Sequence, residues 1–173
     1  MRTIFAKYSK TDKMKYVDFY QRHFNNLKPK TLLEIGVLDG DSLRIWQDVF
    51  PETRIVGIDR DQKIKDKHTD LEIFIGDQRD LDFLDRVINI IGIPNIVIDD
   101  GGHYMSMQVQ SHSHIFPKLN PGDIYVIEDL NTSYVQEYND SDLNTIDYLK
   151  SLIDTRKLTK ITFEHNICIM VSG

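Results

Sequence analysis

Short apolar runs recur at regular intervals along the chain, and longer segments of mixed polarity separate them. Each run is continuous rather than alternating, which is typical of strands that are covered on both faces. The runs that read as strands cover residues 31–36, 54–59, 71–76, 95–100 and 123–129. This pattern predicts a largely parallel sheet.

The segments between the runs have apolar residues at helical spacing. Helices are expected at 41–50, 79–91 and 104–119, and two more frame the set at 12–26 and 141–155. Alternation of strand and helix is the pattern of parallel strands joined by crossovers. The last two runs, LTKITFEH and NICIMVSG, meet at His165–Asn166 and predict a hairpin. The expected fold class is therefore α/β: a doubly wound, mostly parallel seven-stranded sheet with an antiparallel C-terminal hairpin strand.

Composition narrows the classes of protein that fit. The 173 residues, 40% of them hydrophobic, predict a single domain over 1–173, with 1–30 as a helical cover on a core of 31–173. The net charge of −6 makes nucleic acid and an anionic membrane surface unexpected partners. The single cysteine, Cys168, excludes an intrachain disulfide and a cysteine-rich zinc site. No apolar run approaches the roughly 20 residues of a membrane span, so a cytoplasmic protein is expected.

Acidic residues recur where the expected strands end. The carboxyl ends of parallel strands meet at one edge of a sheet, where ligands bind in open α/β folds. Helix capping is the alternative reading, and it fits Asp41 or Asp77. It explains acids at five successive strand ends poorly. These ends carry Glu34, Asp59, Asp77, Asp99–Asp100 and Glu128–Asp129.

The first three strand ends indicate a pocket for a nucleoside. Gly36 and Gly40 permit close approach of a ligand to the start of a helix, although their spacing is neither GxGxxG nor a Walker loop. Asp59 follows about twenty residues later, where an acid hydrogen-bonds ribose hydroxyls. Asp77 and Gln78 offer a carboxylate and an amide to an adenine edge. Such a pocket, without a phosphate cradle, fits S-adenosylmethionine better than NAD.

Several segments together carry a resemblance to a known family. They are KTDKMKYVDFYQRHF, LLEIGVLDGDSLRIW, RIVGIDRD, GDQRD, VIDDGGHYMS and FPKLNPGDIYVIEDLNTSY, with the closing hairpin. The chain resembles class I S-adenosylmethionine-dependent methyltransferases. More narrowly, VIDDGGH with YVIEDLNTSY resembles the metal-dependent sugar O-methyltransferases of the macrolide-modifying (mycinamicin and tylosin) kind.

The resemblance implies a Rossmann-like fold, S-adenosylmethionine and Mg²⁺ as cofactors, and methyl transfer to a hydroxyl of a sugar or glycosylated metabolite. It also implies that Thr11, Asp12 and Lys13 cover the cofactor, for which a plain N-cap by Thr11 or Asp12 is the alternative. Glu34 is expected on the cofactor side, and Asp99 behind the site or on the side of the methionine group. Short cores of this type often need a partner, so a homo-oligomer is possible.

The VIDDGGH stretch is expected to carry the chemistry. If the fourth and fifth strands are neighbours, Asp100 lies close to Glu128 and Asp129, and three crowded carboxylates need a cation. Hard oxygen ligands without cysteine suit Mg²⁺, and the resemblance implies the same three ligands. A divalent metal lowers the pKa of a bound oxygen acid, which lets a histidine act as the base. His103, just past the Gly101–Gly102 turn, is the expected catalytic base, and the resemblance implies the same role.

Other functions and plainer roles for residues stay open. A catechol-type enzyme methylating small phenols usually has a lysine base in place of the Gly-Gly-His turn. A non-catalytic S-adenosylmethionine-binding module and a metal-dependent hydrolase are further alternatives. His112 lies on the apolar stripe of helix 104–119 and is expected to be packed, whereas His114 lies off it and is expected to be solvated. Trp46 is expected on the buried side of its helix.

Overall fold

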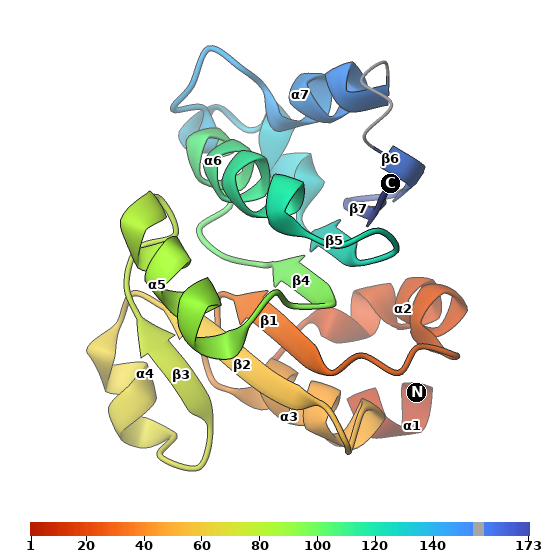
Figure 1. Cartoon of the computed structure of the whole chain (residues 1–173), viewed down its shortest axis with the longest axis vertical. Helices are drawn as coiled ribbons and strands as arrows, with labels where there is room; N and C mark the ends of the chain where they lie inside the picture. The colour runs from red at the N-terminus through yellow and green to blue at the C-terminus, as the bar shows by residue number, and fades with distance from the viewer. Residues whose placement is uncertain (154–157) are drawn as a thin grey trace.

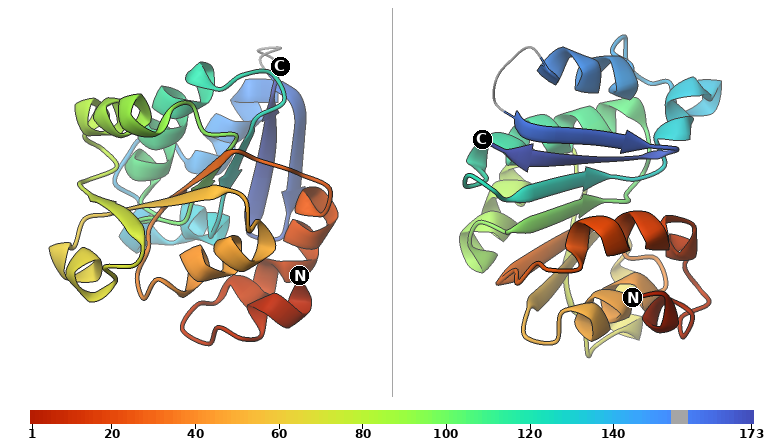
Figure 2. Two further views of the ribbon diagram at one scale, coloured as in Figure 1. Left: turned by 60° about the horizontal axis from the view of Figure 1, so that its bottom comes forward. Right: turned by 90° about the vertical axis from the view of Figure 1, so that its right-hand side faces the viewer.

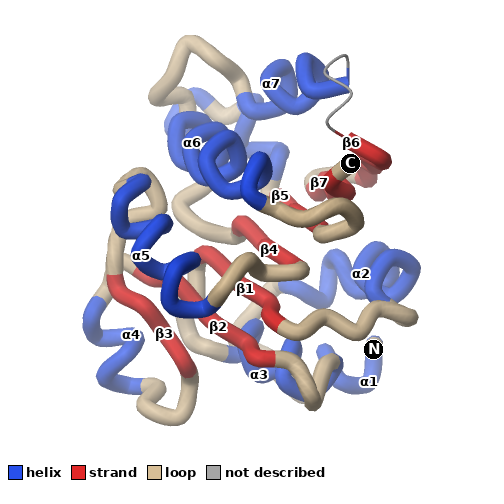
Figure 3. The backbone as a smooth tube through the Cα atoms, in the orientation of Figure 1, coloured by secondary structure: helices blue, strands red, loops and turns tan. Residues whose placement is uncertain are grey.

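The computed structural model describes residues 1–153 and 158–173 of the chain. Within these ranges the strands form one sheet in the order β3-β2-β1-β4-β5-β7-β6 (Figures 1 and 3). Strands β1 to β5 are parallel, and β7 runs antiparallel to both β5 and β6. The predicted fold class is therefore confirmed. The strands are β1 (Thr31–Ile35), β2 (Arg54–Asp59), β3 (Glu72–Ile75), β4 (Ile96–Asp99), β5 (Ile124–Ile127), β6 (Leu158–Glu164) and β7 (Ile167–Ser172).

Helices pack on both faces of this sheet (Figure 2). α1 to α3 contribute to the buried cluster on one face, and α5 to α7 to the cluster on the other. On the first face Trp46 of α3 packs against the rings of Tyr20 and Phe24. This agrees with the prediction that Trp46 lies on the buried side of its helix. The α-helices are α1 (Arg2–Phe5), α2 (Val17–Phe24), α3 (Asp41–Val49), α4 (Gln62–Lys67), α5 (Leu81–Ile91), α6 (Met105–Ile115) and α7 (Thr145–Leu152).

Several expected helix boundaries were wrong for local reasons. The helix expected at 12–26 is a 3₁₀ turn, η1 (Lys13–Tyr16), followed by α2. The one expected at 104–119 ends at Ile115, and Pro117, which has no amide hydrogen, lies in the 3₁₀ turn η2 (Phe116–Lys118). The helix expected at 141–155 begins only after its N-cap Asn144, and positions 154–155 lie outside the described residues.

Two short helices, α1 and α4, were not predicted. The sequence of α4 is QKIKDK and none of its residues is buried, so it has no apolar stripe to detect. Its start is stabilised by the Asp61 side chain, which accepts a hydrogen bond from the Lys63 amide.

The strand order reverses between β1 and β4, because β1 pairs with β2 on one side and β4 on the other. The helix that follows β1 packs on one face of the sheet, and the helix that follows β4 packs on the other. This leaves a crevice at the carboxyl ends of the two strands. Gly36 follows β1 there with φ +91°, and a Cβ at this position would lie 2.2 Å from the carbonyl oxygen of Asp100. Glycine is therefore required where the loops after β1 and β4 meet.

Candidate active site

A cavity of about 660 Å³ lies at this reversal of strand order. Its size is that of a typical small-molecule site. Segments from both halves of the sheet line it, together with a segment that precedes the first strand. The lining comprises residues 9–12, 35–38, 58–60, 76–78 and 100–103 with Asp41, Ser42, Met107 and Asp129.

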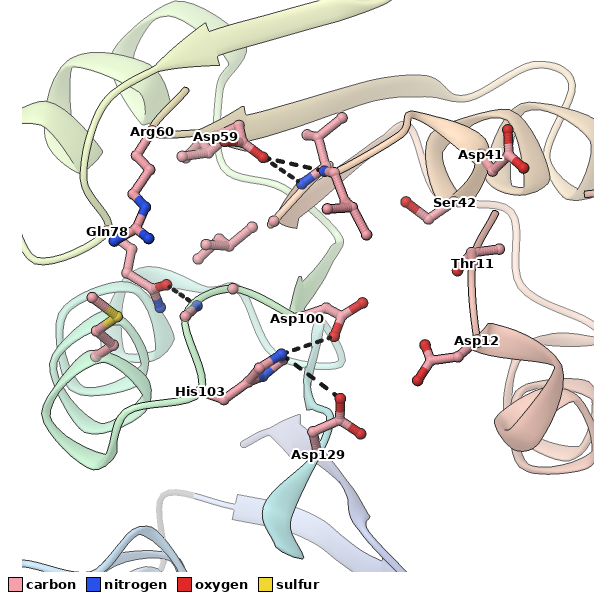
Figure 4. Close-up of a pocket in the computed structure, with 18 of the residues that line it drawn as sticks. Thr11, Asp12, Asp41, Ser42, Asp59, Arg60, Gln78, Asp100, His103 and Asp129 are labelled. Carbon is pink, nitrogen blue, oxygen red and sulfur yellow. Dashed lines mark hydrogen bonds and ion pairs between the residues drawn. The ribbon is translucent and has the colours of Figure 1, made fainter. Parts of the chain in front are cut away.

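Four of the seven residues expected to bind the cofactor line this cavity: Gly36, Asp59, Asp77 and Gln78. The carboxylate of Asp59 accepts hydrogen bonds from the amides of Val37 and Leu38 at 3.0 and 3.2 Å (Figure 4). It thus fixes the loop after β1 to the end of β2. A direct bond from Asp59 to a ribose stays a prediction.

Gln78 holds two loops together. Its Nε2 donates to Asp99 Oδ1 at 3.1 Å, and its Oε1 accepts from the Gly102 amide at 3.0 Å (Figure 4). Both ends of the amide are thus engaged within the protein. Asp77 forms a 2.7 Å ion pair with Arg79 and remains at the cavity wall.

The other three expected cofactor residues do not line the cavity. Gly40 has φ +78° and packs against Leu71 and His68, so its small size serves packing. Glu34 lies fully buried within β1. Asp99 is buried behind the Gly101–Gly102 turn, where Ser111 and Tyr125 donate hydrogen bonds to it. Burial raises the pKa of Asp99, even though these hydrogen bonds favour the charged form.

Asp100, His103 and Asp129 converge at the end of the cavity. His103 Nε2 lies 3.9 Å from Asp100 Oδ1 and 3.7 Å from Asp129 Oδ2 (Figure 4). This is possible because β4 and β5 are paired neighbours, as expected. His103 and Asp129 both have positive φ, at 59° and 54°, as does Leu38 in the cavity wall. Such backbone strain concentrates at functional sites.

Hydrogen bonds keep the Asp129 side chain in place. Its Oδ1 accepts from Lys15 Nζ and from the Tyr16 hydroxyl, each at 2.6 Å. Burial alone would raise the pKa of Asp129, but the hydrogen bonds from Lys15 and Tyr16 lower it below its ordinary value. Asp129 therefore faces the cavity as a carboxylate, with Oδ2 toward His103.

Glu128 points into the protein and does not line the cavity. Its Oε1 accepts from Lys13 Nζ at 2.7 Å and from the Tyr20 hydroxyl. Its Oε2 is buried and has no hydrogen-bond partner among the described residues. Burial, followed by repulsion from Asp100, raises the pKa of Glu128 to about 8. Its assignment as a metal ligand stays a prediction.

Lys13, which the resemblance implied to cover the cofactor with Thr11 and Asp12, does not line the cavity but is buried behind it. Its side chain is 0% exposed, and its Nζ contacts carboxylates from three strand ends. Burial alone would lower the pKa of Lys13, but attraction from Asp100, Glu128 and Glu34 raises it well above its ordinary value. One signal was present: Glu34 in the apolar run TLLEIG needs a buried counter-charge.

The carboxylates suit a divalent cation. Among the described residues, the ligand atoms of Asp100, His103 and Asp129 form a group that lies within 4.8 Å. The unpartnered Oε2 of Glu128 is an additional buried oxygen. Carboxylate oxygens without sulfur are the donor set that Mg²⁺ prefers. The residues present therefore fit the predicted ion.

The segment before η1 lines the cavity, as the resemblance implied for Thr11 and Asp12 (Figure 4). The Lys10 amide donates to Asp41 at 2.9 Å, which ties this segment to the start of α3. Thr11 Oγ1 also accepts from the Lys13 amide at 3.3 Å, whereas Asp12 makes no side-chain cap. The N-cap residue of η1 is Asp12, and Thr11 and Asp12 both line the cavity without forming a side-chain N-cap.

The ring of Tyr138 lies near the rings of His103 and Tyr104. Tyr138, in the 3₁₀ turn η4 (Gln136–Tyr138), has its ring centroid 6.5 Å from that of His103 and 5.4 Å from that of Tyr104. The preceding turn, η3 (Leu130–Tyr134), is held by Thr132, whose hydroxyl donates to the His103 carbonyl at 3.1 Å. This arrangement offers aromatic surface beside the expected base.

The remaining histidines have structural surroundings. His112 is buried, stacks on Phe116 and bonds to the Tyr148 hydroxyl at 2.8 Å, which confirms its predicted packing. His114 was expected to be solvated, and this was wrong. Its side chain is only 19% exposed and lies 2.8 Å from Asp85, because α5 and α6 pack side by side.

Comparison with known proteins agrees with this geometry. The tetracenomycin rhamnosyl 2'-O-methyltransferase of Streptomyces olivaceus is 35% identical over 152 residues, covering 80% of this chain and 40% of the relative. Mycinamicin VI 2''-O-methyltransferase of Micromonospora griseorubida is 35% identical over 154 residues, covering 80% and 39%. The chain is similar to sugar O-methyltransferases. The resemblance expected from the VIDDGGH and YVIEDLNTSY motifs is thus confirmed.

A solved structure shows the same likeness in three dimensions. The mycinamycin-pathway methyltransferase MycE, in complex with Mg, SAH and mycinamycin VI, superposes with a TM-score of 0.89 at 30% identity. The match covers 99% of this chain and 53% of MycE. The chain thus spans about two fifths to half the length of these relatives. No family model matches the sequence.

None of the helices in the described part of the chain has the length and apolarity needed to cross a membrane.

Proposed function

We propose that this chain is an Mg²⁺-dependent O-methyltransferase that moves the methyl group of S-adenosylmethionine to a hydroxyl of a sugar or glycosylated small molecule. The observation that carries the proposal is the convergence of Asp100, His103 and Asp129 at the end of the cavity beside Gly36. The relatives' names, which specify methylation of rhamnosyl and mycinamicin hydroxyls, support the acceptor class.

The cavity offers the features that S-adenosylmethionine needs. Gly36 brings the backbone close to a ligand, and Asp59 and Asp77 stand at the next two strand ends. The segment of residues 9–12 also lines the cavity, with Thr11 and Asp12 across from Gln78 (Figure 4). In this proposal the nucleoside lies between the loops after β1, β2 and β3, and the methyl group faces His103.

Asp100, Glu128 and Asp129 are the proposed holders of Mg²⁺. The ion, when bound, makes a nearby hydroxyl more acidic. His103 then accepts the hydroxyl proton at Nε2, the atom that faces both aspartates. The acceptor oxygen forms a bond to the methyl carbon as the carbon–sulfur bond breaks, and the thioether leaves as a neutral group. Tyr104 and Tyr138 supply the adjoining surface for a sugar ring.

Methyl-transfer assays with labelled S-adenosylmethionine test this function. Glycosides with free hydroxyls are expected to accept the methyl group, EDTA to abolish transfer, and Mg²⁺ to restore it. Full activity in chelator would contradict the metal-dependent mechanism. Transfer to catechols but not to glycosides would favour the small-phenol alternative. Binding of S-adenosylhomocysteine without transfer to either class would favour a non-catalytic binding module.

A further inference from the structure

A buried lysine connects the N-terminal segment to the carboxylates of the proposed metal site. Lys13 Nζ lies 2.8 Å from Glu34 Oε1, 2.7 Å from Asp100 Oδ2 and 2.7 Å from Glu128 Oε1. Two N–H groups of this ammonium donate hydrogen bonds to Asp100 and Glu128, whereas Glu34 lies within ion-pair distance without a hydrogen bond. Asp100 and Glu128, which follow Lys13 in the sequence by 87 and 115 positions, meet at this one nitrogen.

Lys13 engages one oxygen of two of the three proposed metal ligands and leaves the other oxygen of each unengaged by Lys13. Asp100 gives Oδ2 to Lys13, while its Oδ1 points toward His103 Nε2 at 3.9 Å. Glu128 gives Oε1 to Lys13 and Tyr20, while its Oε2 is buried without a hydrogen-bond partner. A carboxylate held by one oxygen cannot rotate freely, so the orientation of its second oxygen is set in advance.

The charges around Lys13 also favour a role in metal binding. Glu34, Asp100 and Glu128 carry three formal negative charges, and Lys13 balances one. Lys15 balances Asp129 at the cavity edge. The three carboxyl groups therefore outnumber the single buried ammonium group that contacts them.

We propose that Lys13 is a positioning residue for the metal: it holds Asp100 Oδ2 so that Oδ1 is directed toward His103 at the proposed Mg²⁺ site, and it holds Glu128 Oε1 so that the buried Oε2 is left unengaged. This inference rests on the proposed function. Groups that hydrogen-bond metal-ligating residues typically contribute 10–100-fold to metal affinity. Lys13 does not line the cavity, so in this proposal it acts only through the two carboxylates.

The test is calorimetric titration of Mg²⁺ into the protein saturated with S-adenosylhomocysteine, compared between wild type and Lys13→Met. Methionine keeps the length of the side chain without its charge. The expected result is a Mg²⁺ affinity lowered 10–100-fold. Lys7→Met is the matched control, because Lys7 belongs to the same N-terminal region but pairs with Asp48 at the surface, 60% exposed. Its Mg²⁺ affinity is expected to equal that of wild type.

Titration of Ca²⁺ separates positioning from simple electrostatics. Ca²⁺ tolerates irregular coordination, whereas Mg²⁺ requires near-octahedral geometry. Loss of positioning therefore lowers affinity for Mg²⁺ more than for Ca²⁺. A role as a mere competing charge predicts the opposite, because removal of a positive charge raises affinity for both ions.

The outcomes are distinct. An unchanged or raised Mg²⁺ affinity in folded Lys13→Met overturns the inference, and so does an equal loss for both ions. If Lys13→Met does not fold, the same titrations are made on the double variant Lys13→Met/Glu34→Gln. The second substitution removes one of the charges that Lys13 balances. Failure of both variants to fold also overturns it, since Lys13 would then be a requirement of the fold. Absence of Mg²⁺ binding in wild type would instead contradict the proposed function itself.

Discussion

His103 and Asp100 lie three residues apart, and the structure gives them different surroundings. His103 presents Nε2 to the cavity, and its carbonyl is held by Thr132. Asp100 is tied through Oδ2 to Lys13 and offers Oδ1 to the site. Substitutions of the two residues should therefore impair the reaction in different ways.

His103→Ala is expected to lower turnover by roughly 10²–10⁴, the usual loss for a general base, while Mg²⁺ affinity changes little. Asp100→Asn is expected to lower Mg²⁺ affinity, so that excess Mg²⁺ restores part of the rate. Steady-state rates against Mg²⁺ concentration distinguish the two. If the His103→Ala enzyme is less stable but keeps most of its turnover, His103 serves packing and is not the base.

At the scale of elements, the loop between β1 and α3 lines the cavity. Gly36→Ala would place a methyl group 2.2 Å from the Asp100 carbonyl and push apart the loops after β1 and β4. Affinity for S-adenosylhomocysteine is expected to fall at least tenfold, or about 1.4 kcal/mol, by calorimetry.

Gly122→Ala is the matched control for this loop. Gly122 has φ +90°, close to the +91° of Gly36, but nothing lies within 4 Å of its Cβ position. Its replacement should cost about 1–2 kcal/mol of stability through backbone strain and leave ligand affinity intact. Equal effects of the two substitutions on affinity would show that close approach at Gly36 does not shape the cavity.

At the scale of the whole molecule, the buried acids make stability depend on pH. The pKa of Glu128 is about 8 in the folded protein, above its ordinary 4.5, so the folded state binds an extra proton between these values. The free energy of unfolding therefore falls as pH rises through this window. Glu34 and Asp99 have pKa values shifted in the same direction. His112, whose pKa falls from 6.5 to about 3, has the opposite effect only below pH 6.5.

In EDTA, the melting temperature of wild type is therefore expected to fall between pH 6.5 and 8. The loss is at most about 1.4 kcal/mol per pH unit for one group, which corresponds to a few degrees. Glu128→Gln should flatten this slope. Thermal denaturation followed by circular dichroism at both pH values provides the measurement. A melting temperature that rises over this range, equally in both proteins, would exclude Glu128 as the cause.

The fold and much of the site follow from local patterns in the sequence. Continuous apolar runs predicted the five parallel strands, and two runs that meet at His165–Asn166 predicted the hairpin. Acids just after the runs predicted that Asp59, Asp100 and Asp129 reach one edge of the sheet, and all three line the cavity. These predictions succeed because strand direction alone determines which residues stand at the carboxyl edge.

Only the tertiary structure decided which of these side chains face the cavity. Gln78 lines the cavity, but its amide group is engaged by Asp99 and Gly102, and Glu128 turns inward to Lys13 and Tyr20. Each of these contacts joins segments far apart in the chain, so no local periodicity records it. A buried charge is paired by whichever opposite charge the packed elements bring within reach. The sequence by itself therefore determined which edge of the sheet carries the acids, and the packing of the N-terminal segment beneath that edge determined how they are oriented.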